Sequence, residues 1–334
     1  MKSFLLTGWK MLRYRSVLIL VLFMLLSVAL HTNGMMLPVG AEIAAVIILA
    51  FSYLCATCAN DLVDWKIDQI NLKGNSERPL VNGMGTRRQL VILLVIGAVV
   101  SIALGFILDT RLGLLMVGSI ILNLFYSLPP FRVSYRALLT PFYLAFCYVV
   151  VSYLVGYVLA TRYDSTVQFE WGYLVAFYCF FVARISLKDF RDRKGDAAVG
   201  KPTIILKYGK AAVSVLSTSA ALLGSAVLII LSRNQPLLVV ALILFTASIV
   251  FVEYRIYRAT KLDRELLSIA YGARMGNGLL LTFLGWVLLR GQGAPLDVLV
   301  IFSLTMLFVY GYMFWFYVKH TDKFLVGGRK MEIR

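Results

Sequence analysis

Apolar residues form ten long blocks along the chain, separated by short polar or basic segments. The blocks approach or exceed the roughly 20 residues with which an α-helix crosses a hydrocarbon layer about 30 Å thick. In hydrocarbon every backbone amide needs a partner, and the alternating pattern of a membrane β-barrel is absent, so we expect helices. The predicted spans are residues 17–33, 41–60, 89–108, 112–126, 138–160, 169–187, 211–232, 236–254, 268–289 and 298–318.

The composition agrees with a membrane protein. Of the 334 residues, 60% are hydrophobic and only 15% are charged, whereas a soluble domain carries about 25% charge. No segment has the composition of a soluble domain. The sequence therefore predicts one all-α polytopic membrane domain over residues 1–334, a bundle of about nine to ten transmembrane helices.

Basic residues are distributed unevenly between the two sides of the predicted bundle. Of 33 Lys and Arg, 27 fall in the termini and in the loops after even-numbered spans, and two lie inside spans. The opposite side has only Arg111, Arg162, Arg233 and Arg290. By the positive-inside rule, both termini and the long basic loops are cytoplasmic. Because these residues are spread over many loops, the net charge of +16 does not indicate nucleic-acid binding.

A first acidic motif lies where the second span reaches the cytoplasmic interface. On a helix, four side chains fall within an arc of roughly 100°: Asn60, Asp61, Asp64 and Asp68. Oxygen ligands without His or Cys suit Mg²⁺, and a bound cation would relieve the repulsion among the carboxylates. The alternative is a solvated helix end whose acids pair with Lys66 and Lys73.

A second acidic motif follows the sixth span, on the same side of the membrane. If that helix continues, three carboxylates lie within an arc of roughly 60°: Asp189, Asp192 and Asp196. Carboxylates do not bind a diphosphate directly, but they hold Mg²⁺ ions that bridge to its oxygens and stabilise charge as it leaves. Two such motifs indicate two metal positions.

Basic and hydroxyl side chains accompany the acids on this side. Arg78 and Arg132 could bind phosphate oxygens in a bidentate way, although membrane topology alone also explains an arginine in these loops. Tyr126 could donate a hydrogen bond to the leaving group. Arg184 lies one turn before Lys188, inside a span, so we expect it to face a polar cavity or an acid.

Two further polar residues, Arg274 and Asn277, lie in the ninth span. Either an interhelical hydrogen bond or a place in the cavity wall would account for them. The four cysteines, including the Cys55-x-x-Cys58 pair, all fall in apolar helices, and we interpret them as packing residues.

Several segments together resemble the UbiA superfamily of intramembrane aromatic prenyltransferases. They are Asn60-Asp61-x-x-Asp64-x-x-x-Asp68, Glu77-Arg78-Pro79-Leu80, the Tyr126–Arg132 loop, the Lys188–Asp196 motif and Gly200-Lys201-Pro202-Thr203. The resemblance covers about residues 15–290 and leaves 298–334 as an extra helix and tail. It implies a mostly nine-helix bundle around a central cavity with a cytoplasmic cap over the active site, and Mg²⁺-dependent ionisation of a polyprenyl diphosphate.

The resemblance also implies roles for individual residues. Asn60, Asp64 and Asp68 would bind one metal ion and Asp192 and Asp196 a second, with Asp61 and Asp189 in support. Arg78, Tyr126 and Lys188 would act on the diphosphate. Some members have Lys four residues after the Tyr, where this chain has Pro130, so Arg132 is expected to take that role.

The function predicted from these features and from the resemblance is Mg²⁺-dependent transfer of a prenyl group from a polyprenyl diphosphate to an aromatic ring, in quinone or prenylated-metabolite biosynthesis. The alternative within the family is a lipid alcohol, a porphyrin alcohol or a sugar phosphate as acceptor. A transporter is the alternative from another class, but it would place its acids near the middle of the bilayer. Both motifs lie instead at helix ends beside Arg and Lys, which favours diphosphate chemistry.

Overall fold

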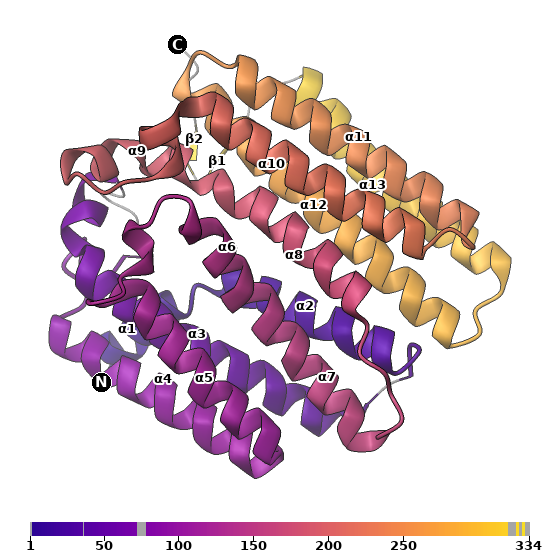
Figure 1. The fold of residues 1–334 in the computed structure, drawn as a ribbon, viewed down its shortest axis with the longest axis horizontal. Coiled ribbons are helices and arrows are strands. Elements are labelled where there is room, and N and C mark those ends of the chain that lie inside the picture. Colours follow the sequence, from indigo (N-terminus) through magenta and orange to yellow (C-terminus); the bar gives the residue numbers. More distant parts are fainter. Residues whose placement is uncertain (1, 36, 72–77, 320–324, 327–328, 331–334) are drawn as a thin grey trace. The chain divides into compact units, whose positions relative to one another are not determined.

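The structure is a computed structural model that describes residues 2–35, 37–71, 78–319, 325–326 and 329–330. Apart from one short hairpin and the connecting loops, these residues are helical (Figure 1). Nine helices in the described part are long and apolar enough to cross a membrane, and the shorter apolar helix α8 (Trp171–Ser186) coincides with the sixth predicted span, residues 169–187. The prediction of an all-α polytopic membrane protein is confirmed.

The chain divides into two compact units. Unit 1 comprises Met1–Thr32, Met36–Phe169 and Asp192–Thr203. Unit 2 comprises Asn33–Met35, Glu170–Arg191 and Ile204–Arg334. Helix α9 (Lys188–Ala198) therefore begins in unit 2 and ends in unit 1.

Unit 1 contains the N-terminal helices, drawn from indigo to magenta in Figure 1. They are α1 (Lys2–Leu12), α2 (Tyr14–His31), α3 (Val39–Asn71), α4 (Arg87–Leu108), α5 (Thr110–Ser127), the 3₁₀ turn η1 (Val133–Tyr135), α6 (Leu139–Ala145), the π-helical turn η2 (Phe146–Val150) and α7 (Val151–Tyr163).

Within unit 1, α3 packs against α4 and α5, and α2 packs against α7. A side chain at Gly156 of α7 would place its Cβ 2.4 Å from the carbonyl oxygen of Met24, so the absence of a side chain lets α2 and α7 approach closely. Thr86 and Gln89 form a capping box that fixes the start of α4. These features set how closely α2 and α7 pack and where α4 begins.

Unit 2 contains α8 and the C-terminal helices. They are α10 (Ile204–Leu231), α11 (Pro236–Arg258), α12 (Leu262–Gly291), α13 (Leu296–Lys319) and the two-residue strands β1 (Leu325–Val326) and β2 (Arg329–Lys330), which pair antiparallel. Helix α10 packs against α8 and α11, and α12 packs against α11 and α13. Gly224 of α10 lies against the backbone of α8, where a Cβ would be 2.8 Å from the Ala176 oxygen.

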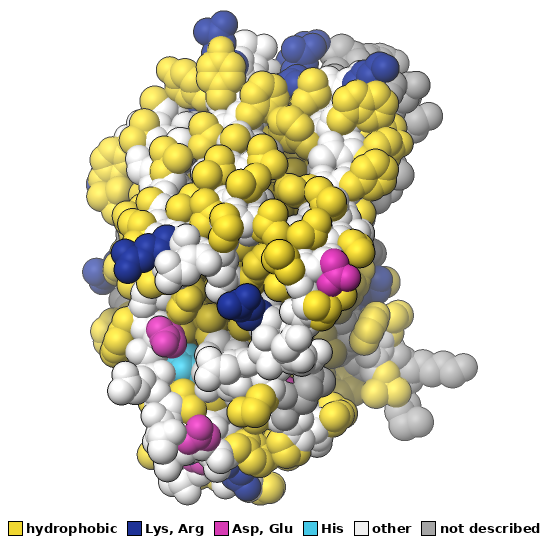
Figure 2. Space-filling model, turned by 90° about the vertical axis from the view of Figure 1, so that its right-hand side faces the viewer, with side chains coloured by type: hydrophobic (Ala, Val, Ile, Leu, Met, Phe, Trp, Pro, Cys, Tyr) yellow, Lys and Arg dark blue, Asp and Glu magenta, His cyan; other side chains and the backbone are white. Residues whose placement is uncertain are grey.

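Large apolar side chains cover much of the outer surface of these helices. On α13, Ile301, Leu304 and Phe308 are each more than 60% exposed. Figure 2 shows one face of the molecule, on which hydrophobic side chains predominate and charged side chains are scattered. A surface of this kind suits contact with lipid chains rather than water.

The ends of two predicted spans differ from the helices in the structure, in both cases at polar segments. Helix α3 continues past residue 60 to Asn71, so the whole first acidic motif lies on one helix. The assumption that the sixth span continues without a break is wrong, because α8 ends at Ser186 and α9 starts at Lys188. The second motif nevertheless lies on a single helix, α9.

Candidate functional site: an acidic cluster held by arginine and lysine

The three carboxylates of the first motif are buried at the polar end of α3. Asp61, Asp64 and Asp68 are 2%, 5% and 8% exposed. Such burial is costly for charged groups unless each finds a partner. The alternative of a solvated helix end is therefore wrong for these acids.

Asp61 is neutralised by two arginines from other parts of unit 1. Nη2 of Arg13 lies 2.5 Å from Oδ1 of Asp61, and Nη1 of Arg78 donates a hydrogen bond to the same oxygen. Arg78 also lies 3.0 Å from Oδ2 of Asp68. Arg78, which was expected to bind phosphate oxygens, therefore bridges two carboxylates of the first motif in this structure.

Asp64 has its own set of polar neighbours. Its Oδ2 accepts hydrogen bonds from Nδ2 of Asn60 at 3.2 Å and from Nζ of Lys201 at 3.1 Å. Nη2 of Arg132 lies 3.8 Å from Oδ1, an oxygen that is buried and accepts no hydrogen bond from the described residues. The guanidinium of Arg132 also stacks over the ring of Tyr135 at 3.7 Å. Asp64 is therefore held on one side and open to a further ligand on the other.

Two of these arginines have an unusual backbone. Arg13, at the junction of α1 and α2, has φ 45°, and Arg132, before η1, has φ 37°. This left-handed conformation costs a residue with a side chain roughly 1–2 kcal/mol. Both strained positions lie where the side chain reaches a buried carboxylate, an arrangement common at functional sites.

The end of α9 that belongs to unit 1 lies beside the first motif. The amide of Gly195 donates a hydrogen bond of 2.6 Å to Oδ1 of Asn71, the last residue of α3. Lys201, which binds Asp64, also lies 4.0 Å from Oδ1 of the buried Asp196. Asp192 is half-buried and lies close enough to Asp68 for the two carboxylates to repel each other. The structure thus brings Asp192 and Asp196 together with the carboxylates of α3.

The remaining predicted residues are placed as follows. Asp189 is buried and Lys188 half-buried on the part of α9 that belongs to unit 2. Tyr126, near the end of α5, stacks against Tyr143 with ring centroids 6.3 Å apart. Glu77 and Lys73 lie outside the described residues. Lys66, offered above as a partner for the acids, lies instead over the ring of Trp65.

The donor set suits a hard divalent cation. It consists of carboxylate and amide oxygens, the ligands that Mg²⁺ prefers. In the described part of the chain, no three acidic, His or Cys side chains converge into a ready-made metal site, and the carboxylates of the first motif pair with cations such as Arg13 and Lys201. The buried Oδ1 of Asp64 accepts no hydrogen bond from the described residues, so its lone pairs are available for a metal bond. The residues therefore fit Mg²⁺, provided that the cations can move onto an incoming anion.

Three members of this cluster received no role in the sequence prediction. Arg13 was assigned only to the basic N-terminal tail, Lys201 only to a motif of the resemblance, and Asn71 was not considered. Lys201 stood in a recognisable segment, so the sequence held a signal for it. For Arg13 and Asn71 the partner depends on tertiary structure, and no local pattern reveals it.

Comparison with known families decides the class of protein. The model of the UbiA prenyltransferase family matches residues 17–272. The chain belongs to the UbiA prenyltransferase family. It is accordingly a multi-pass integral membrane prenyltransferase, and the transporter alternative is set aside. The matched region ends within α12 and does not include α13.

Curated relatives of this UbiA protein include digeranylgeranylglyceryl phosphate synthases. The one from Methanothermobacter thermautotrophicus is 26% identical over 234 residues, which cover 65% of this chain and 79% of that protein. The one from Methanobrevibacter smithii is 24% identical over 224 residues, 62% of this chain and 71% of that protein.

Solved UbiA structures have the same fold. A UbiA homolog from Archaeoglobus fulgidus bound to GPP and Mg²⁺ superposes with a TM-score of 0.63 and 16% identity, covering 84% of this chain and 99% of that one. The apo UbiA homolog from Aeropyrum pernix K1 gives a TM-score of 0.63 and 17% identity, covering 83% and 96%.

Other polar residues within the spans of this UbiA protein contact one another or an aromatic ring. Nη1 of Arg184 donates a hydrogen bond of 2.8 Å to Oδ1 of Asn277, which is the interhelical hydrogen bond considered above. Arg274 lies 5.0 Å from the ring of Tyr271. Cys55 and Cys58 are buried and unbridged, as expected for packing residues.

Proposed function

We propose that this enzyme transfers the prenyl group of a prenyl diphosphate to the hydroxyl of a glyceryl-phosphate-type lipid, in a reaction that requires Mg²⁺. The observation that carries the proposal is the joining of the two acidic motifs within unit 1 through Lys201 and Asn71. The named activity of the relatives, digeranylgeranylglyceryl phosphate synthesis, supports the lipid acceptor.

The metal ligands in this proposal are those expected from the motifs. Asn60, Asp64 and Asp68 hold one Mg²⁺, and Asp192 and Asp196 hold a second, with Asp61 and Asp189 in support. The bound ions neutralise the diphosphate and favour its departure from the allylic carbon. A homolog of the same fold with GPP and Mg²⁺ supports this choice of ion.

The cations of the cluster have two roles in the proposal. Without substrate they neutralise the buried acids, as Arg78 does for Asp61 and Asp68. When the diphosphate enters, Arg78 and Arg132 turn their guanidinium groups to its oxygens, since planar forks suit phosphate geometry. Lys188 and Tyr126 add further donors on the leaving-group side. The oxygen of the acceptor hydroxyl then bonds to the allylic carbon as the carbon–oxygen bond to the diphosphate breaks, and the hydroxyl proton is lost.

The aromatic acceptor expected from the sequence is the second candidate. It retains support from the general resemblance to aromatic prenyltransferases, but the curated relatives favour a glyceryl-phosphate acceptor. Both candidates share the same diphosphate chemistry and differ only in the nucleophile. An assay of acceptors therefore separates them.

The decisive experiment uses purified full-length protein, Mg²⁺ and radiolabelled geranylgeranyl diphosphate with two acceptors in parallel. One is a prenylglyceryl phosphate with a free hydroxyl, and the other is a hydroxybenzoate. We expect a labelled ether lipid with the first and no labelled product with the second. A C-prenylated aromatic product would overturn the proposed acceptor and leave the prenyltransferase assignment intact.

We further propose that the acidic cluster and both termini face the cytoplasm. The distribution of 27 basic residues against 4 supports this orientation. It gives access to a water-soluble Mg²⁺ pool at the polar end of α3, while the prenyl chain extends into the apolar interior.

A further inference from the structure

A separate basic cavity of about 220 Å³ lies within unit 2. It is formed where α11 ends, α12 begins and α13 ends. Its polar lining consists of Tyr254, Arg255, Arg258, Arg264, Ser268 and Tyr317. Because α11, α12 and α13 are membrane spans, this cavity is at the level of the membrane interface.

The three arginines that line the cavity have no acidic partner among the described residues. Glu265 is adjacent to Arg264 in the sequence, but it is buried and accepts a hydrogen bond of 2.7 Å from Lys210. Arg255 lies over the ring of Tyr317 at 5.1 Å, which fixes its direction without neutralising it. Three positive charges therefore converge on one small cavity.

The wall of the cavity is held by hydrogen bonds and stacking. The hydroxyl of Ser268 donates to the carbonyl oxygen of Arg264 at 2.8 Å and lies 2.6 Å from the hydroxyl of Tyr317. Tyr317 is buried and stacks on Tyr271 with ring centroids 4.2 Å apart. These contacts fix the end of α13 against α12, so the cavity exists before any ligand binds.

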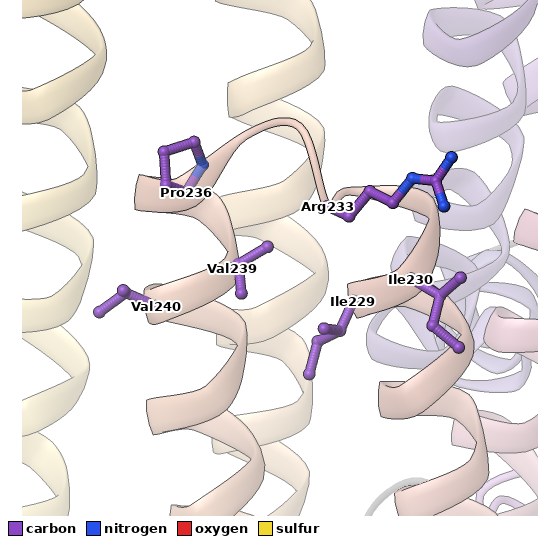
Figure 3. Close-up of a pocket in the computed structure, with 6 residues that line it drawn as sticks. All are labelled: Ile229, Ile230, Arg233, Pro236, Val239 and Val240. Carbon is purple, nitrogen blue, oxygen red and sulfur yellow. The ribbon is translucent and has the colours of Figure 1, made fainter.

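Another pocket in unit 2 provides a contrast. Its volume is about 490 Å³, and it lies at the turn between α10 and α11 (Figure 3). Its lining is apolar except for Arg233, the side chains being Ile229, Ile230, Pro236, Val239 and Val240. The apolar lining suits a lipid chain, and Arg233 is its one charged residue. The positive-inside rule accounts for basic residues in the segment 255–267, but it does not require three of them to line one cavity.

We propose that the cavity between α11, α12 and α13 binds a phosphate group, either in the headgroup of an anionic lipid or in a soluble phosphate ester. Guanidinium groups pair with phosphate through two parallel hydrogen bonds, and basic pockets between membrane helices suit lipid phosphates. Arg258 and Arg264 are exposed and free to close on the ligand, while Arg255 is half-buried and already oriented. The site is distinct in its residues from the acidic cluster of unit 1.

The test measures the melting temperature of the purified full-length protein in neutral detergent with EDTA and without prenyl diphosphate. The probes are dioctanoyl phosphatidate, dioctanoylglycerol, which lacks the phosphate, and inorganic phosphate. Ligand that binds the folded state raises the melting temperature with concentration. We expect phosphatidate to do so and dioctanoylglycerol to have no effect. An equal shift with inorganic phosphate would identify a soluble phosphate as the ligand, and a shift with phosphatidate alone would identify a lipid.

Variants locate the binding. The double variant Arg258→Gln/Arg264→Gln should weaken phosphatidate binding roughly tenfold or more, since two charge-assisted contacts are lost. Arg258→Lys/Arg264→Lys keeps both charges and should retain more affinity than the glutamine variant. Arg233→Gln removes one charge at the other pocket and should bind like the unmodified protein. No shift with any phosphate probe, or an equal shift in the glutamine variant, would overturn the proposal.

Discussion

Lys201 and Asp64 are 137 residues apart in the sequence, yet Nζ of Lys201 lies 3.1 Å from Oδ2 of Asp64. The same ammonium group lies 4.0 Å from Asp196. One lysine thus holds a carboxylate from each acidic motif, in the place where a divalent cation is expected during the reaction.

Loss of Lys201 should make the protein depend on metal for stability. Lys201→Ala leaves two buried carboxylates without their cation, which should lower the free energy of unfolding by about 1–3 kcal/mol in EDTA. Added Mg²⁺ should raise the melting temperature of the variant more than that of the unmodified protein. Lys207→Ala, an exposed lysine nearby in the chain, is the control. Equal Mg²⁺ responses in all three proteins would contradict a shared site for lysine and metal.

Replacement of a single acid should abolish transfer and leave the fold intact. Asp64→Asn and Asp192→Asn each keep shape and hydrogen-bonding capacity but remove a charged ligand. We expect each to lower kcat/KM at least about 100-fold, as for other groups that stabilise developing charge. Asp297→Asn, in the exposed first turn of α13, should have no effect on activity. Melting curves check that the proteins are folded, and near-normal turnover in either variant would rule out the two-metal assignment.

A methyl group at Gly195 should disturb the junction of the two motifs. The Cβ of Gly195→Ala would lie 2.6 Å from the side-chain amide of Asn71, which must move and give up its hydrogen bond to the Gly195 amide. We expect reduced transfer. In an Asn71→Ala background the clash is absent, so the same substitution should cost less, and a double-mutant cycle measures this coupling. Gly118→Ala, with open space around its Cβ, is the control. Additive effects of the two substitutions would contradict the contact.

Removal of metal should affect activity and stability differently. Excess EDTA should abolish transfer, and Mg²⁺ should restore it. The melting temperature without substrate should change little, because Arg13, Arg78, Arg132 and Lys201 already neutralise the acids of the first motif. Activity assays and thermal melts on the same preparation provide the measurement. A large fall in melting temperature in EDTA would show that the metal-free cluster is not balanced by these cations.

The two ends of α12 should react on opposite sides of the membrane. Lys261→Cys lies just before α12 and Arg290→Cys near its end. If the termini are cytoplasmic, a maleimide that does not cross membranes should label Arg290→Cys in intact cells and Lys261→Cys only after lysis. A variant of Cys55, Cys58, Cys147 and Cys179 to alanine provides the background. Labelling of Lys261→Cys in intact cells would reverse the proposed orientation.

The sequence predicted the helical spans well because apolar length is a local property. All ten predicted blocks coincide with helices, including the short α8. The errors lie at polar ends. Helix α3 extends to Asn71 because its acids find cationic partners from other segments, and those partners are not visible in the local pattern.

The acidic residues of the site were predictable because their spacing places them on one helix face. Their pairing was not predictable. Arg13 lies between α1 and α2 and itself adopts the left-handed backbone conformation that lets its side chain reach Asp61. Because this position is not a glycine, the sequence does not indicate the bend. The expectation that carboxylates repel one another in the absence of metal overlooked four cations that other parts of unit 1 supply.

Gly209 interrupts α10 with φ 81° and ψ 174°. A continuous helix of 28 residues would be about 42 Å long, well beyond a hydrocarbon layer of about 30 Å. The part after the break, from Lys210 to Leu231, is about 33 Å long and needs little tilt to match that layer. The break therefore leaves a membrane-spanning part of α10 whose length matches the hydrocarbon layer, so this helix can cross it with little hydrophobic mismatch.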